Sequence, residues 1–399
     1  MFFVLAGLLL GPDVLGVLHI DIESSTIREL AELTLALVLF TDASTVDLDG
    51  LRRDAGVVGR LLGIGLLLTI AGGGLVAWLL FPELPIATAL LIGAILAPTD
   101  AALGLPVVTN PAVPIRIRRV LNVESGLNDG IATPFVVLFI SLATATNGTE
   151  GVHLIEAIEE TAIAIATGAV VGAVGGLLLV AADRRKLTSE LSRQIAVLAL
   201  ALGAYVVSLT LGGNGFIAAF VAGLAFGGAT RKGEEHAEEF SEVAGILLSI
   251  GVWLVFGATL VGSLIFDAQD VRPIVYAILS LTVIRMVPVA LSLVGSRLAF
   301  PTVAFIGWFG PRGLASIVFG ILALDALTES GGATDVLART VGWTVLLSVI
   351  AHGLSANPLA ARYGRWIDAR RRTTEEQLPE LEERSELQPS ARTTWSRRS

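Results

Sequence analysis

Apolar segments of membrane-spanning length follow one another along almost the whole chain, and this repetition limits the fold more than any single motif. A helix needs about 20 mostly apolar residues to cross the hydrocarbon core of a bilayer. Hydrophobic residues make up 54% of the 399 residues and charged residues only 16%. One soluble core could not bury that much apolar surface. The sequence therefore predicts an all-α, polytopic membrane protein.

About twelve segments have the required length, and the charges between them support that number. Loops rich in arginine and lysine alternate with loops that are acidic or nearly free of both. By the positive-inside rule the basic loops and the C-terminal tail are cytoplasmic, which predicts a multi-pass protein of the cell membrane. The predicted segments are centred near Leu9, Leu37, Leu68, Leu91, Val136, Val170, Leu200, Val221, Val255, Ile278, Phe319 and Leu346.

The two ends of the chain differ from this bundle. Residues 1–10 are apolar but too short to cross a bilayer, and they lack the basic start and the cleavage site of a signal peptide. We interpret them as the remainder of a helix, with the reading frame beginning inside it. We therefore expect a usual first helix to be absent. Residues 1–366 are predicted to form the transmembrane domain. Residues 367–399 form a charged cytoplasmic tail that we expect to be disordered.

Composition excludes several kinds of partner and site. The net charge of −9 and the dispersed basic residues argue against a nucleic-acid partner. The chain has no cysteine, and its four histidines lack ligand spacing, so neither a cofactor nor a resident metal is predicted. It has no Walker-type phosphate loop and no nucleophile-and-base arrangement. ATP-driven transport and an intramembrane enzyme are therefore not expected.

The first of two acidic steps lies in an interrupted apolar segment. Within residues 92–108, Pro98 is followed by Thr99 and Asp100, so this helix is expected to unwind near its middle. Unwound backbone exposes groups that ions can satisfy. A carboxylate at bilayer depth costs roughly 2.5–3.5 kcal/mol, which indicates a role in handling charge. Residues 253–262 carry a comparable glycine interruption, and paired interruptions in two halves of a chain indicate an inverted-repeat transporter.

The next apolar segment carries the second acidic step. Ser125 and Asp129 are four positions apart and share a helix face, whereas Asn128 points towards a neighbouring element. Hydroxyl, carboxylate and amide oxygens are hard ligands that suit a small alkali cation. With Thr99 and Asp100 they form a candidate cation site. The alternative is that Asp129 pairs with a buried arginine while its polar neighbours serve helix packing.

Four further charges lie in or beside apolar segments. Glu124 is five positions from Asp129 and can be neutralised separately. Arg285 and Arg312 are the available cations, and a structural ion pair is predicted because a buried guanidinium cannot lose its proton. Asp42 lies at the inner end of its segment, where it either lines an entrance or is an interfacial residue.

These motifs occur in the order found in a known family. They are Phe40-Thr41-Asp42, Pro98-Thr99-Asp100, Glu124-Ser125-Gly126-Leu127-Asn128-Asp129-Gly130, the helix of Arg285, and Gly310-Pro311-Arg312-Gly313. Over roughly residues 3–366 the chain resembles monovalent cation:proton antiporters of the Na+/H+ exchanger type, including the NhaP-like members. The resemblance implies a homodimer. It also implies an inverted-repeat core, similar to NhaA, in which two broken helices cross.

The resemblance assigns a role to each residue of the candidate site. It implies that Asp129 binds the cation and the proton in turn, with Ser125 and Asp100 as further ligands. Thr99 would offer its carbonyl or hydroxyl oxygen, and Asn128 would hold the unwound stretch.

The charges outside that set also receive implied roles. Glu124 would pair with Arg285, with Arg312 close by. Two departures from the family pattern are present. Alanine follows Asp100 where many relatives have proline, and Asp42 stands where relatives often carry glutamate.

The expected function is antiport of Na+ or Li+, or of K+, for protons, by competition at Asp129 with alternating access across the membrane lipid. Asparagine rather than a second aspartate before Asp129 implies electroneutral exchange. The alternative is a cation-coupled symporter of a small organic solute. That class would need a roomier pocket with aromatic contacts, and aromatic residues make up only 6% of the chain.

Overall fold

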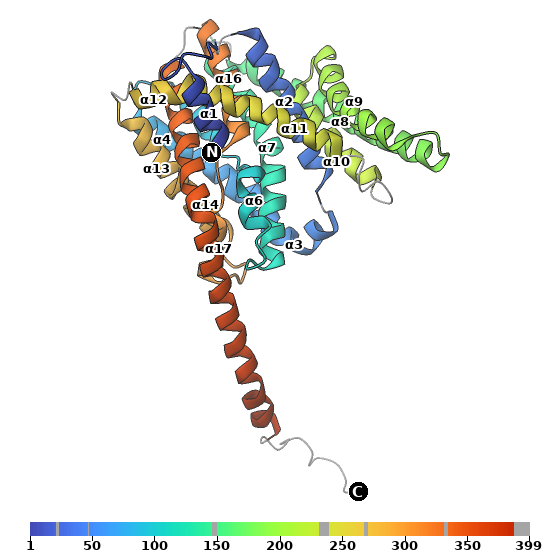
Figure 1. Cartoon of the computed structure of the whole chain (residues 1–399), viewed down its shortest axis with the longest axis vertical. Coiled ribbons are helices and arrows are strands. Elements are labelled where there is room, and N and C mark those ends of the chain that lie inside the picture. The colour runs from blue at the N-terminus through green and yellow to red at the C-terminus, as the bar shows by residue number, and fades with distance from the viewer. Residues whose placement is uncertain are drawn as a thin grey trace, which may run out of the picture.

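The computed structural model describes residues 1–20, 24–46, 48–145, 150–230, 239–266, 270–330 and 334–386. All regular structure in these ranges is helical, as predicted, and the helices form one bundle (Figure 1). Two π-helical turns, Leu61–Gly65 and Gly257–Val261, join helices end to end. The helices are α1 (Phe2–Leu10), α2 (Ser25–Ser44), α3 (Leu48–Arg60), α4 (Leu66–Leu80), α5 (Ile86–Ile95), α6 (Ala101–Val108), α7 (Ile115–Thr144), α8 (Glu150–Arg184), α9 (Glu190–Thr210), α10 (Gly215–Thr230), α11 (Glu239–Phe256), α12 (Gly262–Phe266), α13 (Arg272–Leu281), α14 (Val283–Ser292), α15 (Phe300–Trp308), α16 (Leu314–Ser330) and α17 (Thr334–Glu386).

Helix length and composition confirm a multi-pass membrane protein. Seven stretches within the described ranges are long and apolar enough to cross a bilayer, and three shorter apolar helices accompany them. Each predicted segment centre lies in a helix, while the full number of spans stays a prediction. The seven stretches are Asp54–Leu80, Ile115–Thr144, His153–Arg184, Glu190–Thr210, Phe240–Ile265, Arg272–Ser292 and Thr334–Arg370.

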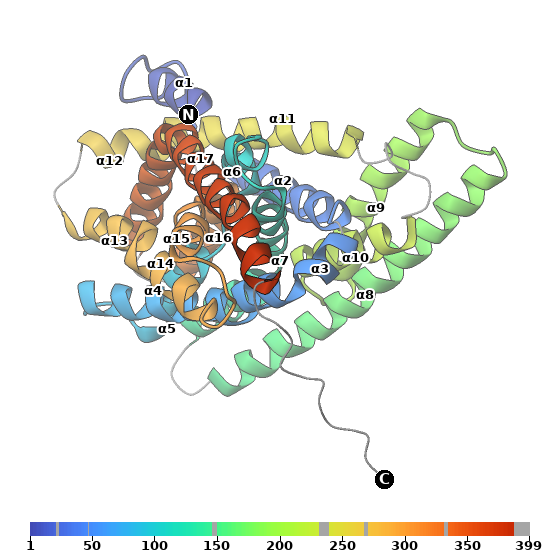
Figure 2. The same ribbon diagram turned by 90° about the horizontal axis from the view of Figure 1, so that it is seen from below.

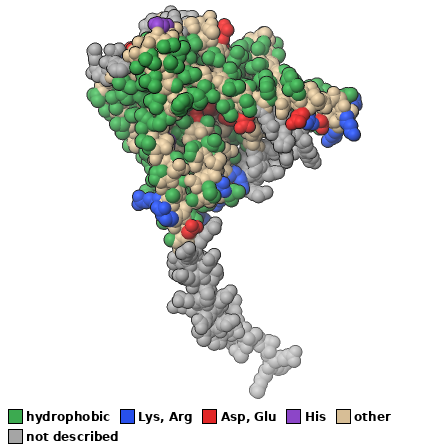
Figure 3. Space-filling view, viewed as in Figure 1, with side chains coloured by type: hydrophobic (Ala, Val, Ile, Leu, Met, Phe, Trp, Pro, Cys, Tyr) green, Lys and Arg blue, Asp and Glu red, His purple; other side chains and the backbone are tan. Residues whose placement is uncertain are grey.

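The outer surface is apolar, as a lipid-facing surface must be. Side chains such as Leu79, Leu178 and Leu247 are each more than 60% exposed. Figure 3 shows hydrophobic side chains over most of the upper face, with Lys and Arg gathered along the lower and right-hand edges. The last helix, α17, runs from the bundle past its lower end (Figure 1) and is helical as far as Glu386. It thus extends into the predicted tail, of which residues 387–399 lie outside the described residues.

Glycines let helices approach one another at backbone distance near the centre of the bundle. A Cβ atom at Gly223 of α10 would lie 2.2 Å from the carbonyl oxygen of Phe40, and one at Gly227 would lie 2.3 Å from that of Ser44. Packing through small residues is typical of membrane helices. It holds the C-terminal end of α2, which carries Asp42, against the inner helices (Figure 2).

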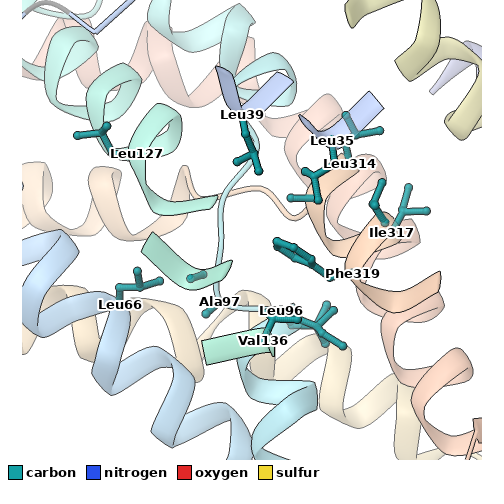
Figure 4. Close-up of a cluster of buried hydrophobic side chains, with 14 of the residues drawn as sticks. Leu35, Leu39, Leu66, Leu96, Ala97, Leu127, Val136, Leu314, Ile317 and Phe319 are labelled. Atoms are coloured by element: carbon teal, nitrogen blue, oxygen red, sulfur yellow. The ribbon is translucent and has the colours of Figure 1, made fainter. Parts of the chain in front are cut away.

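Within the described residues, two helical segments are interrupted inside the bundle by stretches of five residues. One interruption, residues 96–100, separates α5 from α6, as the sequence predicts. The other, residues 309–313, separates α15 from α16. Leu96 and Ala97 of the first interruption lie close to Leu314 and Phe319 in a buried apolar cluster (Figure 4).

The prediction that residues 253–262 form the second interruption is wrong in position. There the chain continues from α11 through a π-helical turn into α12. The glycines of this stretch serve packing instead, because a Cβ atom at Gly257 would lie 2.2 Å from the carbonyl oxygen of Val4 in α1. A glycine-rich stretch therefore marked a close helix contact, and Pro311 marks the true break.

Candidate functional site

The two interruptions bind each other through Asp100. The backbone N–H of Asp100 donates to the carbonyl oxygen of Pro311 at 2.8 Å. Its carboxylate accepts from the N–H of Leu103 through Oδ1 and from the N–H of Leu314 through Oδ2, both at 2.8 Å. One side chain therefore caps the N-termini of α6 and α16, whose partial positive charges it offsets. Gly313 admits it, because a Cβ atom there would lie 2.0 Å from Oδ2.

Arg312 serves the opposite helix end. Its Nη1 donates to the carbonyl oxygens of Ala97 and Pro98 at 2.9 and 3.1 Å, just beyond the end of α5. Its backbone N–H donates to Oγ of Ser348 in α17 at 2.7 Å. The side chain is fully buried, and its Nε and Nη2 have no hydrogen-bond partner within the described residues. Arg312 therefore stabilises freed carbonyl groups, which the sequence reasoning did not predict.

His352 of α17 completes the set of helix-end contacts. Its Nε2 lies 2.8 Å from the carbonyl oxygen of Trp308, the last residue of α15, and its Nδ1 lies 3.3 Å from Oγ of Ser348. From the sequence this histidine was weighed only as a metal ligand, so its role at the helix end was not predicted. The available signal was a histidine within an apolar segment, since such a residue needs buried hydrogen-bond partners.

The candidate ligands on α7 face the first interruption. Oγ of Ser125 lies 3.1 Å from Oγ1 of Thr99, and Nδ2 of Asn128 donates to the same Thr99 oxygen at 2.5 Å. Oδ1 of Asn128 has no hydrogen-bond partner among the described residues. Ser125 and Asn128 of α7 thus both contact Thr99 of the first interruption.

Asp129 is the buried carboxylate of this group. It is 8% exposed, and its Oδ1 has no hydrogen-bond partner in the described part of the chain. It interacts electrostatically with Asp42, Asp100 and Arg312, but within the described ranges no arginine forms an ion pair with it. The alternative interpretation, in which Asp129 pairs with a buried arginine, therefore has no support from the contacts. An unpaired carboxylate oxygen at this depth needs either a proton or a cation.

Glu124 lies on the same helix but is fully neutralised. Its Oε1 lies 2.6 Å from Nη2 of Arg285, and both side chains are 2% exposed. Arg285 also lies against the second interruption, because a Cβ atom at Gly310 would be 2.5 Å from its Nε. The pair thus links α7 to α14 beside the second interruption.

Asp42 lies beside the site. It is half-buried near the end of α2, and a Cβ atom at Gly126 of α7 would lie 3.6 Å from its carbonyl oxygen. It interacts electrostatically with Asp100 and Asp129. No group of three metal-ligating side chains is close enough to hold a resident metal among the described residues.

Space at the site is small. A narrow cavity of about 10 Å³ between α6 and α7 reaches Ser125 and is otherwise lined by residues such as Gly104, Asn122 and Phe309. That volume admits about one water molecule. A volume of this size beside Ser125 suits a water molecule or a single small ion.

Comparison with known proteins gives the family and the fold of the chain. Residues 1–362 match the transmembrane region of the sodium/hydrogen exchangers. The chain belongs to this family. A solved relative, the sodium proton antiporter MjNhaP1 from Methanocaldococcus jannaschii, has the same fold, with a TM-score of 0.75, 23% identity and coverage of 91% of this chain and 92% of that one.

Two curated exchanger relatives are similar along most of the chain. The K(+)/H(+) antiporter NhaP2 of Shewanella sp. strain ANA-3 is 27% identical over 367 residues, which are 90% of this chain and 62% of that protein. The K(+)/H(+) antiporter NhaP of Alkalimonas amylolytica is 24% identical over 371 residues, or 92% of this chain and 62% of that protein. This exchanger chain therefore spans less than two thirds of their length.

Proposed function

We propose that this exchanger moves a monovalent cation across the membrane in exchange for protons, by competition at Asp129. The observation that carries the proposal is the buried Oδ1 of Asp129, which has no hydrogen-bond partner among the described residues; the same holds for Oδ1 of Asn128, the preceding residue on α7. These two oxygens, together with Ser125 and Thr99, offer the hard ligands that an alkali cation prefers. Membership of the exchanger family and the names of the curated relatives support the same activity.

Exchange follows from the protonation chemistry of one carboxylate. A protonated Asp129 cannot hold a cation, and a bound cation disfavours protonation by its charge. The carboxylate therefore carries one or the other. If only neutralised forms cross the low-dielectric barrier, each cation moved one way requires a proton moved the other way. One such carboxylate, with Asn128 before it, gives electroneutral exchange of Na+, Li+ or K+ for H+.

Asp100 takes a double role in this proposal. Both carboxylate oxygens already accept a backbone N–H, yet each oxygen retains a second lone pair. Its negative charge also interacts with Asp129, which favours a cation nearby. Asp42 lies near the C-terminal end of α2, and a cation would pass it on entering the site.

The architecture proposed for transport is an inverted repeat with α5/α6 and α15/α16 as the equivalent broken segments. Their mutual hydrogen bonds support this arrangement. We further propose about twelve spans, a homodimer, and a tail on the cytoplasmic side, where basic loops gather.

Symport of an organic solute is the alternative function, and the cavity argues against it. Ligand pockets for organic molecules usually hold about 300–1,000 Å³, whereas the cavity beside Ser125 measures about 10 Å³. Uptake of an organic solute by proteoliposomes, without cation-dependent proton movement, would favour the symporter.

The decisive test is Asp129→Asn in everted membrane vesicles. The substitution retains the shape of the side chain but removes the charge that both ions need, so cation-dependent proton efflux should fall to the background level. The matched control is Asp335→Asn, the same change at an exposed position in the first turn of α17. Retention of half or more of the exchange by Asp129→Asn would remove this residue from the centre of the mechanism.

A further inference from the structure

A second polar cavity lies at the end of the bundle where α3 meets α7, away from Asp129. It measures about 230 Å³ and is lined by Asp54, Gly56, Val57, Arg60, Arg116 and Ser296. The lining comes from α3, from the first turn of α7 and from the turn after α14. The cation site uses none of these residues, so the cavity needs its own explanation.

Arginine outnumbers acid in and around this cavity. Asp54 is buried and accepts from Nε of Arg116 at 2.8 Å and from Nη1 of Arg119 at 3.4 Å. Arg60 donates through Nη1 to the carbonyl oxygen of Val294 at 2.7 Å. Among the described side chains, Asp54 contacts Arg116 and Arg119, and Arg60 lines the same cavity, so three guanidinium groups lie in and around it for one carboxylate. Each guanidinium carries five N–H donors, and these contacts use one from each.

Because contacts with the protein hold these arginines in place, they favour one bound anion over diffuse counterions. Asp54 holds Arg116 and Arg119 from inside the protein, and Val294 holds Arg60 from the other wall. Guanidinium groups held in this way bind phosphate through paired hydrogen bonds. The cavity therefore has the chemistry of a phosphate site.

Apolar side chains that face lipid adjoin the cavity. Ile64 is 51% exposed on the turn that follows α3, and Leu291 and Val294 are 57% and 69% exposed at the end of α14. The two elements touch, because a Cβ atom at Gly65 would lie 3.3 Å from Oγ of Ser292. A molecule with a phosphate group in the cavity could therefore lay hydrocarbon chains along this ridge.

We propose that the cavity binds the phosphate of an anionic phospholipid, whose acyl chains lie along α4 and α14. A free phosphate ion would bind the arginines but would make no contact with the exposed apolar side chains of Ile64, Leu291 and Val294. Gly56 lines the cavity and has open space at its Cβ position, so the wall is clear of protein atoms there.

The experiment measures stabilisation of the purified, detergent-solubilised protein against heat as lipid is added. Phosphatidylglycerol should raise the unfolding temperature in a saturable way, whereas phosphatidylcholine and inorganic phosphate should have little effect. Arg60→Gln should raise the half-saturating concentration of phosphatidylglycerol about tenfold, as expected for one charge-assisted hydrogen bond.

A blocking variant separates cavity binding from general charge effects. Gly56→Leu keeps every charge and fills open space, so the protein should fold normally but lose the response to phosphatidylglycerol. Gly203→Leu is the matched control, because it also has open space at its Cβ position and lies on α9, away from the cavity.

Three outcomes would overturn the proposal. An undiminished lipid response in Gly56→Leu would place the binding elsewhere. Equal stabilisation by inorganic phosphate would identify a site for the free ion. Equal stabilisation by phosphatidylcholine would show a general effect of lipid.

Discussion

Among the described residues of α7, one buried acid is ion-paired and another is not. Glu124 and Arg285 neutralise each other at 2.6 Å and are almost inaccessible to solvent. Asp129, five positions along α7, instead has an oxygen without a hydrogen-bond partner in the part of the chain that the structure describes. The same helix thus carries one acid that is ion-paired and one, Asp129, to which the proposed function assigns the transported ions.

Removing one partner of the buried pair should cost stability more than selectivity. Glu124→Gln leaves Arg285 buried without its counter-charge, a defect worth about 3–5 kcal/mol in other buried pairs. We expect a lower unfolding temperature and less folded protein, with the preference among Na+, Li+ and K+ unchanged. Thermal unfolding of the purified variants measures the first effect, and vesicle assays across the three cations measure the second.

A charge swap provides the internal control. Glu124→Arg combined with Arg285→Glu restores opposite charges and should recover some folded protein. The pairing would be refuted if the double variant were no more stable than either single variant while a swap with Arg312 succeeded.

At the scale of the helices, the main feature is the joint between the two interruptions, by which we mean the hydrogen bonds that Asp100 and Arg312 make there. Asp100 caps α6 and α16 together, and Arg312 satisfies the carbonyl groups beyond the end of α5. One carboxylate therefore offsets the partial positive charges at the N-termini of α6 and α16. One guanidinium offsets the partial negative charge at the C-terminal end of α5. The two broken segments are therefore joined by hydrogen bonds.

Asp100→Asn tests this joint. The amide has one acceptor oxygen, so it can cap α6 or α16 but not both, and it carries no charge to offset the helix dipoles. A lost cap costs about 0.5–2 kcal/mol, so we expect a lower unfolding temperature together with a severe loss of exchange. Thermal unfolding and the half-saturating cation concentration should both be measured, with Asp335→Asn as the control.

Two results would separate the roles of Asp100. An unchanged apparent cation affinity with reduced stability would make it a capping residue only. Unchanged stability with weakened cation affinity would contradict the double cap as an important contact.

For the whole molecule, competition at one carboxylate predicts how transport depends on pH. Protons displace the cation from Asp129, so the half-saturating cation concentration should rise as pH falls, by up to about tenfold per unit for one competing proton. Turnover should pass through a maximum, because protonation limits it in acid and proton shortage limits it in alkali. Vesicle assays from about pH 6 to pH 9, with the membrane potential clamped by valinomycin, measure both effects.

Stoichiometry follows from the same assay. Exchange of one proton for one cation moves no net charge, so the rate should not depend on the clamped potential. A clear voltage dependence would contradict electroneutral exchange, and a cation affinity independent of pH would contradict a shared site.

Much of the fold and of the site could be predicted because membrane chemistry leaves few alternatives. A bilayer demands long apolar helices, so the segment centres were visible in the chain. A carboxylate in such a segment is costly, which marked Asp100 and Asp129, and the helical repeat placed Ser125 on the same face as Asp129. These inferences are local and need no knowledge of neighbouring helices.

The position of the second break was not predictable by the same reasoning, because glycines serve close packing at Gly257 as readily as they permit unwinding. Partners distant in the chain also stayed hidden, including the carbonyl groups held by Arg312 and the contact of His352 with Trp308. The sequence alone thus determined which polar groups lie in membrane-spanning segments. The free-energy cost of placing a polar group there depends on the lipid and not on neighbouring helices. Only the tertiary structure decided which are satisfied and which stay open to an ion, because a hydrogen bond requires two groups to meet in space.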